Sequence, residues 1–178
     1  MKYIALLRGI NVGGNNKIAM PELKAAFEKK GFENVVTYIN SGNVIFQSGH
    51  DELVVKASCE NLIETNFGLK ITVGIISAEE LCDALAHSPD WWDNDADSKH
   101  NAIFVIPPMT AKEICEQVGA VKPEYEKTDY YGKVIFWSAP LVTFSHTRWS
   151  KIVENKKAYN AVTIRNANTA KKLAELTK

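Results

Sequence analysis

Two stretches of the chain, 90 residues apart, have nearly the same sequence. The first, Gly42–Ser48, reads GNVIFQS, and the second, Gly132–Ser138, reads GKVIFWS. Shorter matches at offsets of 91 and 98 residues pair ITV at 71–73 with VTI at 162–164, and ALL at 5–7 with IFV at 103–105. Three matches in the same order along both halves indicate a tandem duplication.

Hydrophobic periodicity and turn residues predict the order β-α-β-β-α-β for each half. In the first half we expect strands at 2–7, 35–39, 44–47 and 70–76, with helices from Pro21 to Gly31 and at 51–67. In the second we expect strands at 101–106, 125–130, 134–137 and 161–165, with helices at 110–118, 148–155 and 167–176. A helix at 78–86 and an acidic loop around Trp91 and Trp92 connect them.

This order is that of the split βαβ, or ferredoxin-like, arrangement. The sequence therefore predicts an α+β fold made by tandem duplication of a ferredoxin-like βαββαβ unit with antiparallel sheets, in strand order 4-1-3-2. The expected domains are a first unit at 1–77, a connecting helix and acidic loop at 78–98, and a second unit at 99–178.

The strands expected at the centre of each sheet are apolar at successive positions, as in Ile4–Leu7 and Val134–Trp137. A strand with one wet face would alternate apolar and polar residues. Both faces are therefore expected to be buried. The second face could be covered by the other unit, by the connecting segments or by a second chain, so a homodimer remains open.

Composition excludes several classes of protein. No apolar run approaches the roughly 18 residues of a membrane span, and Arg8 stops the first apolar run too early for a secretory signal. We therefore expect a cytoplasmic protein without a membrane partner. The three cysteines, Cys59, Cys82 and Cys115, are far apart, which favours small buried residues over a disulfide framework or a thiolate metal site.

The net charge is zero, but the charges are unevenly distributed. Residues 51–130 contain six lysines and sixteen acidic residues, whereas residues 146–178 contain eight basic residues and two acidic ones. A basic flank of this kind suits an anionic partner, and nucleic-acid binding by the basic ends is one alternative. Well-solvated terminal helices would explain the same pattern.

Antiparallel pairing places the end of the first strand beside the start of the third. Arg8–Gly14 (RGINVGG) should therefore lie next to Asn40–Asn43 (NSGN). Backbone N–H groups of such loops, with a helix N-terminus behind them, can hold an anion. Arg165 ends an apolar strand as Arg8 does, which suits a carboxylate or phosphate. The candidate ligand-binding residues are Arg8, Asn11, Gly13, Gly14, Ser41, Asn43 and Arg165.

These residues also have purely structural explanations. The glycines could serve only the turns, and Asn166 or Asn168 could serve only as a helix N-cap. Gly9 and Gly14 have P-loop spacing, but Asn15 and Asn16 replace the lysine and the hydroxyl residue. No histidine or cysteine spacing predicts a metal site or a cofactor. The positions that carry RNA-stacking aromatic residues in other ferredoxin-like folds are non-aromatic in both copies.

The three motifs at 6–14 (LLRGINVGG), 38–44 (YINSGNV) and 163–169 (TIRNANT) resemble those of the bacterial family named Domain of Unknown Function 1697. The resemblance extends over residues 2 to about 175. It implies a duplicated ferredoxin-like fold and no particular activity. The leading hypothesis is therefore a protein of unknown function that binds a small anionic ligand at the RGINVGG loop. Nucleic-acid binding and a purely structural or dimerising role are the alternatives, and it remains open whether the chain is an enzyme.

Overall fold

Each half of the chain forms a four-stranded antiparallel sheet, as the duplication predicts. The computed structural model describes residues 1–178, and the strand orders are β2-β3-β1-β4 and β6-β7-β5-β8. Both orders are the predicted 4-1-3-2, so the duplicated ferredoxin-like α+β fold is confirmed. The chain divides into two compact units, one comprising Met1–Glu79 with Leu173–Lys178 and the other Glu80–Lys172.

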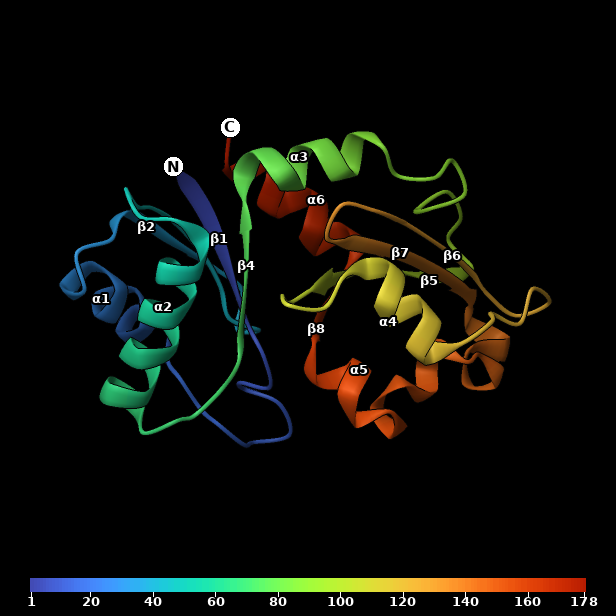
Figure 1. The fold of residues 1–178 in the computed structure, drawn as a ribbon, viewed down its shortest axis with the longest axis horizontal. Coiled ribbons are helices and arrows are strands. Elements are labelled where there is room, and N and C mark those ends of the chain that lie inside the picture. Colours follow the sequence, from blue (N-terminus) through green and yellow to red (C-terminus); the bar gives the residue numbers. More distant parts are fainter. The chain divides into compact units, whose positions relative to one another are not determined.

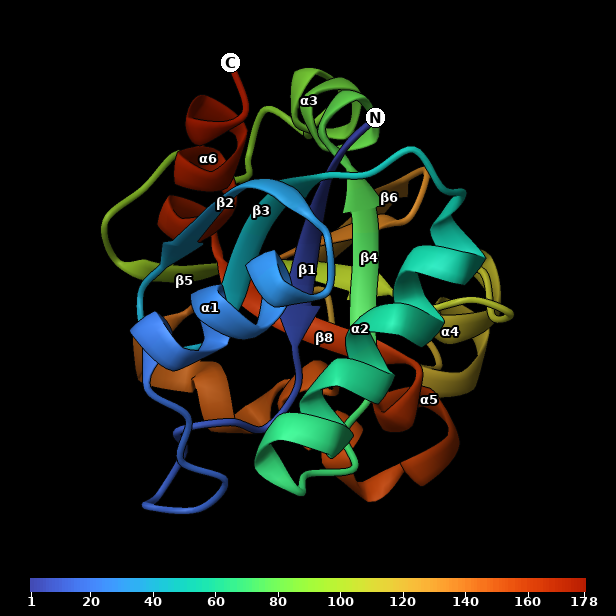
Figure 2. The same cartoon turned by 90° about the vertical axis from the view of Figure 1, so that its left-hand side faces the viewer.

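The first unit places two helices on one face of its sheet (Figures 1 and 2). Its elements are β1 (Lys2–Leu7), α1 (Met20–Lys29), β2 (Glu33–Tyr38), β3 (Asn43–Gln47), α2 (Glu52–Phe67) and β4 (Val73–Ser77). Asp51 begins α2 by accepting a hydrogen bond from the Val54 N–H at 3.0 Å. Gly68 ends the helix in the left-handed conformation, which glycine adopts without steric cost.

An aromatic cluster fills the space between these helices and the sheet. The ring of Phe46 on β3 lies 5.3 Å from that of Phe27 on α1 and 4.5 Å from that of Phe32, centroid to centroid. All three side chains are buried. The cluster holds α1 over the centre of the sheet, and so fixes the point at which the preceding loop must end.

The rest of the chain repeats the pattern, with two 3₁₀ segments and a short helix between its third and fourth sheet strands as the one variation. Its elements are α3 (Ala78–Ala86), β5 (Ser98–Val105), α4 (Ala111–Val118), β6 (Lys127–Tyr131), β7 (Val134–Pro140), the 3₁₀ segments η1 (Leu141–His146) and η2 (Trp149–Glu154), α5 (Lys156–Asn160), β8 (Val162–Asn166) and α6 (Ala167–Leu176). Thr110 and Glu113 begin α4 with a reciprocal capping box. No helix in the structure is long and apolar enough to span a membrane.

The short helix predicted over 148–155 is present as the 3₁₀ helix η2, and the short α-helix α5 follows it. The buried carboxylate of Glu126 accepts hydrogen bonds from the N–H groups of Arg148 (2.6 Å) and Trp149 (3.2 Å), which fixes the start of the segment. Asn155 ends it by capping α5 at the Ala158 N–H. Contacts at both ends therefore hold the segment in tight 3₁₀ turns.

The repeated VIF segments occupy equivalent places, as predicted. Val44–Phe46 lies in β3 between β2 and β1, and Val134–Phe136 lies in β7 between β6 and β5. Both faces of the central strands are buried: Phe46 is 0% exposed and Ile45, its neighbour on the opposite face, is 3% exposed. The expectation of two buried faces is confirmed.

We expect Trp137→Ala to lower the free energy of unfolding by about 3–5 kcal/mol, the range for removing a large core side chain. Trp137 is 3% exposed and packs against Phe144 and Trp149, with ring centroids 5.1 and 6.4 Å away. Chemical denaturation followed by circular dichroism measures the loss. Val142→Ala, at a side chain that is 90% exposed, is the control and should change stability by less than about 0.5 kcal/mol. A loss below about 1 kcal/mol for Trp137→Ala would show that this face is open to solvent.

Candidate functional site

The candidate site lies where the end of β1 meets the start of β3. Leu6 pairs with Asn43 in the antiparallel register, and the Leu7 N–H donates to the Gly42 carbonyl at 2.9 Å. The RGINVGG loop and the NSGN turn are therefore neighbours at one end of the first sheet, as predicted from the strand directions.

The loop itself is a small hairpin. The Asn11 N–H donates to the Asn16 carbonyl at 3.1 Å, and the Asn15 N–H donates to the Val12 carbonyl at 3.0 Å. Gly13 and Gly14 occupy the tip with φ of 57° and 79°. Two consecutive positive φ angles at the tip of a two-residue turn are readily adopted by glycine, so these glycines are needed for the turn itself.

Asn11 connects the hairpin to its surroundings. Its Nδ2 donates to the carbonyls of Ile18 (2.9 Å) and Asn40 (2.8 Å), and its Oδ1 accepts from the Ile18 N–H (2.9 Å). The residue also adopts φ of 53°, which asparagine tolerates better than most residues. The amide therefore joins the loop both to the segment before α1 and to the NSGN turn.

The NSGN turn is held in a conformation that most sequences would avoid. Ile39, a β-branched residue, has φ of 49°, a genuine outlier for this residue type. Gly42 has φ of 79°, and a Cβ there would lie 2.5 Å from Ile10 Cδ1. Asn43, fully buried, donates to the Tyr38 carbonyl (2.9 Å) and to Ser41 Oγ (3.0 Å). The surrounding contacts thus stabilise a strained turn, a feature that concentrates at functional sites.

A cavity of about 410 Å³ lies between this loop and the start of α1, and it is lined by Asn11, Gly14, Lys17, Ile18, Ala19 and Asn40. Ala19 is the N-cap of α1 and makes no side-chain capping hydrogen bond. The first-turn N–H groups of a helix carry partial positive charge, and Lys17 adds an exposed ammonium group beside them. The chemistry of this cavity suits a small anion.

The predicted side chains have unequal places in this arrangement. Asn11 and Gly14 line the cavity, and Gly13 lies exposed at the hairpin tip. Arg8 is half-buried, and its N–H donates to the Thr72 carbonyl at 3.3 Å, but the residue does not line the cavity. Ser41 and Asn43 support the turn. Lys17 was not predicted as a site residue. Only its position just before the helix could have indicated it.

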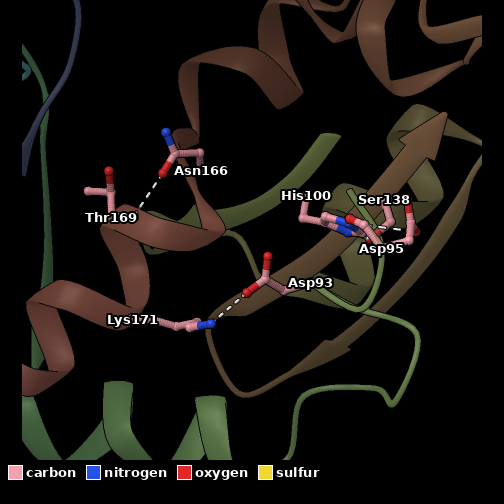
Figure 3. A network of polar contacts seen from close by, with 7 residues as sticks. All are labelled: Asp93, Asp95, His100, Ser138, Asn166, Thr169 and Lys171. Atoms are coloured by element: carbon pink, nitrogen blue, oxygen red, sulfur yellow. Dashed lines mark hydrogen bonds and ion pairs between the residues drawn. The ribbon is translucent and has the colours of Figure 1, made fainter. Parts of the chain in front are cut away.

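Arg165 belongs to the second unit, on β8. Its guanidinium is buried and donates to Thr163 Oγ1 and to the Ile164 carbonyl, both at 2.9 Å. Loss of solvation lowers the pKa of Arg165 to about 10, still far above neutral, so the side chain remains charged. Asn166, the next residue, accepts from the Thr169 N–H at 2.8 Å and caps α6 as predicted (Figure 3).

The second unit also contains a polar cluster that no spacing in the sequence indicated. His100 and Ser138 are 38 residues apart, yet Nδ1 of His100 lies 2.6 Å from Ser138 Oγ (Figure 3). Nε2 lies 2.8 Å from the Asp95 carbonyl, which can only accept, so Nε2 carries a proton. In the neutral ring, the serine hydroxyl then donates to Nδ1. A hydrogen bond from the Ser98 side chain lowers the pKa of the Asp95 carboxyl, which keeps it ionised.

The remaining reactive groups offer little chemistry at neutral pH. Burial raises the pKa of the Cys59 thiol far above its usual range and that of Cys115 to about 11, so neither forms a thiolate readily. Nowhere in the structure do three or more histidine, cysteine, aspartate or glutamate residues gather in a way that could hold a metal ion.

We expect Asn11→Ala to lower the free energy of unfolding by about 2–4 kcal/mol, because two carbonyls and one N–H would lose their partners and alanine disfavours the left-handed backbone. Asn15→Ala in the same hairpin is the matched control. Asn15 is exposed, and its change should be within about 0.5 kcal/mol. Chemical denaturation of both variants decides the matter, and equal stabilities would show that the Asn11 amide does not hold the loop.

Comparison with known proteins is consistent with this fold. The chain matches the family described as Protein of unknown function (DUF1697) over residues 1–136. It is also similar to the solved structure of the conserved bacterial protein SP0830 from Streptococcus pneumoniae, with a TM-score of 0.86 and 30% sequence identity over 99% of this chain and 98% of that one. No match was found among curated proteins. The chain therefore belongs to the DUF1697 family of proteins of unknown function.

Proposed function

We propose that the protein binds a small anionic ligand, bearing a phosphate or a carboxylate, in the cavity between the RGINVGG loop and α1. The observation that carries the proposal is the uncapped first turn of α1, which directly follows the cavity-lining residues Lys17, Ile18 and Ala19. A helix N-terminus without a capping side chain leaves N–H donors for a ligand, here those of Met20 and Glu22, because Pro21 has no N–H.

The residues around the cavity have distinct roles in this proposal. Lys17 neutralises the ligand's charge. Gly14 lets the anion approach the backbone, since it has no side chain and a Cβ added there would meet nothing within 4 Å. Asn11 holds the loop in place through its three hydrogen bonds. Glu22, in the first turn of α1, opposes the ligand because its carboxylate is drawn to the same helix end.

Arg8, Ser41 and Asn43 support the site indirectly. Arg8 contributes positive potential, while Ser41 and Asn43 fix the turn to which Asn11 is hydrogen-bonded. Gly13 gives the hairpin its tip. That Arg165, in the second unit, takes part in ligand binding stays a prediction from its position at the end of an apolar strand.

We expect Lys17→Gln to weaken the binding of inorganic phosphate and of citrate about tenfold or more, as a hydrogen bond to a charged group contributes about 1.5–3 kcal/mol. Glu22→Gln should strengthen binding about threefold, because it removes a competing carboxylate. Isothermal titration calorimetry measures both changes. Lys24→Gln is the matched control: Lys24 is exposed on α1, lies 3.6 Å from Glu28 and does not line the cavity.

Arg8→Ala separates binding from structure in the same assay. Unchanged melting temperature with loss of the anion-induced thermal shift indicates a binding role. A loss of about 1–3 kcal/mol of stability indicates that Arg8 holds the loops together. If Lys17→Gln and Lys24→Gln bind phosphate equally well, the proposed site is not where the anion binds.

A second candidate function is nucleic-acid binding, and one observation favours it. A cavity of about 760 Å³ in the second unit is bordered by four basic side chains, with one acidic side chain, Glu154, also in its lining. The basic residues are Lys122, Arg148, Lys151 and Lys156. The excess of positive charge in the C-terminal sequence is thus gathered in part at one hollow surface, which suits a phosphate backbone.

The double variant Lys151→Gln/Lys156→Gln should weaken binding to single-stranded RNA or duplex DNA and reduce the slope of log K against log salt by about 1–2, since each phosphate contact contributes about 1. Lys112→Gln is the control: Lys112 is exposed on α4, 3.9 Å from Glu116 and outside the cavity. Gel shifts at several salt concentrations give the slopes. Equal slopes for wild type and the double variant would rule out this surface.

A further inference from the structure

A cavity of about 820 Å³ in the second unit is walled by aromatic rings. Trp137 comes from β7, Phe144 from η1, Trp149 from η2 and Tyr159 from α5. The volume lies within the range of about 300–1,000 Å³ that is usual for small-molecule sites, and aromatic walls with a few polar groups are typical of them.

Two donors in this wall have no acceptor. The indole nitrogens of Trp137 and Trp149 are buried and make no hydrogen bond within the protein. Trp92, by contrast, donates its indole N–H to the Asn101 carbonyl at 2.9 Å. Buried polar groups are nearly always paired, and an unpaired one is costly to keep. Both residues line the same cavity, so a molecule bound there is placed to supply the missing acceptors once the shielding side chains move.

The polar rim of the cavity is close to electrical balance. Asp93 is paired with Lys171, its Oδ2 lying 2.6 Å from Nζ (Figure 3). The Lys99 ammonium lies 4.4 Å from the centre of the Phe144 ring, and the lining contains both this positive charge and the negative charge of Asp95. The ring nitrogens of His100 already have partners in Ser138 and Asp95. Neither an anion nor a cation would find a surplus of opposite charge here.

We propose that this cavity binds a neutral, planar heteroaromatic molecule of the nucleobase or nucleoside class. The ring packs against the half-buried rings of Phe144 and Tyr159. The carbonyl or ring-nitrogen acceptors of the ligand accept hydrogen bonds from the two indole N–H groups once the ligand displaces the side chains that shield them. The amides of Asn166 and Asn168, also in the lining, bind the polar edge or the sugar hydroxyls. This site is independent of the anion site proposed for the first unit.

The test titrates the full-length protein with adenosine, guanosine, cytidine and uridine by calorimetry and by tryptophan fluorescence. At least one nucleoside should bind, with an affinity that stays within about twofold between low and high salt, because a neutral ligand releases no counterions. Trp137→Phe, which keeps an aromatic ring but removes the donor, should weaken binding at least fivefold. Trp92→Phe, which removes an indole N–H outside the cavity, should leave the affinity within about twofold of wild type.

A second variant keeps the proposal testable if Trp137→Phe does not fold. Ala96 is exposed and lines the cavity, so Ala96→Phe should block binding without disturbing the core. Lys112→Gln, at an exposed residue outside the cavity, should leave nucleoside affinity unchanged. The proposal is overturned if no nucleoside binds at millimolar concentration, if Ala96→Phe binds as wild type does, or if only nucleotides bind and Lys99→Gln abolishes their binding. Tighter binding of a neutral disaccharide than of any nucleoside would overturn the ring assignment.

Discussion

The antiparallel pairing of the two central strands β1 and β3 is the constraint on which the candidate site depends. Because the strands run in opposite directions, Leu6 lies opposite Asn43, and a loop and a turn some 30 residues apart become neighbours. Asn11 then bridges them through the Asn40 carbonyl at 2.8 Å. Both faces of these strands are buried, so a slip of one residue would exchange the two sets of apolar side chains and is strongly disfavoured. The loops thus inherit the fixed register of the sheet.

Local patterns were enough to predict the sheets, because each strand carries its own signal. The VIF segments, the turns at Gly42 and Gly132 and the strand directions all follow from residues close in sequence. The segment at 148–155 does not follow in this way. Its 3₁₀ form depends on the carboxylate of Glu126, which accepts from two N–H groups more than twenty residues further along the chain. Nothing local distinguishes this buried glutamate from the exposed acidic residues around it.

In the candidate sites too, the features that depend on local sequence could be predicted, and those that depend on distant contacts could not. The hairpin 11–16 could be predicted because asparagine and glycine in left-handed positions have a local reason to be there. That the Asn11 amide would be used for the loop's own backbone, with Lys17 beside the cavity, depends on how α1 packs. The contact between His100 and Ser138 joins opposite positions of β5 and β7, so only the strand register brings them together. The aromatic cavity depends on η1, which the sequence did not predict, and on η2, whose 3₁₀ form the sequence did not indicate.

Gly42 and Gly132 are the same letter in the two copies of the repeat, and both have a positive φ, but they tolerate change differently. A Cβ at Gly42 would lie 2.5 Å from Ile10 Cδ1 and 2.9 Å from Leu7 Cβ, whereas a Cβ at Gly132 would meet nothing within 4 Å. Asparagine, which adopts left-handed backbone more readily than other side chains, could therefore replace the second glycine but not the first. The two copies arose by duplication but now differ in which substitutions they tolerate. The turn of the second copy can accept a side chain at its glycine, whereas the loop packed against the turn of the first copy excludes one.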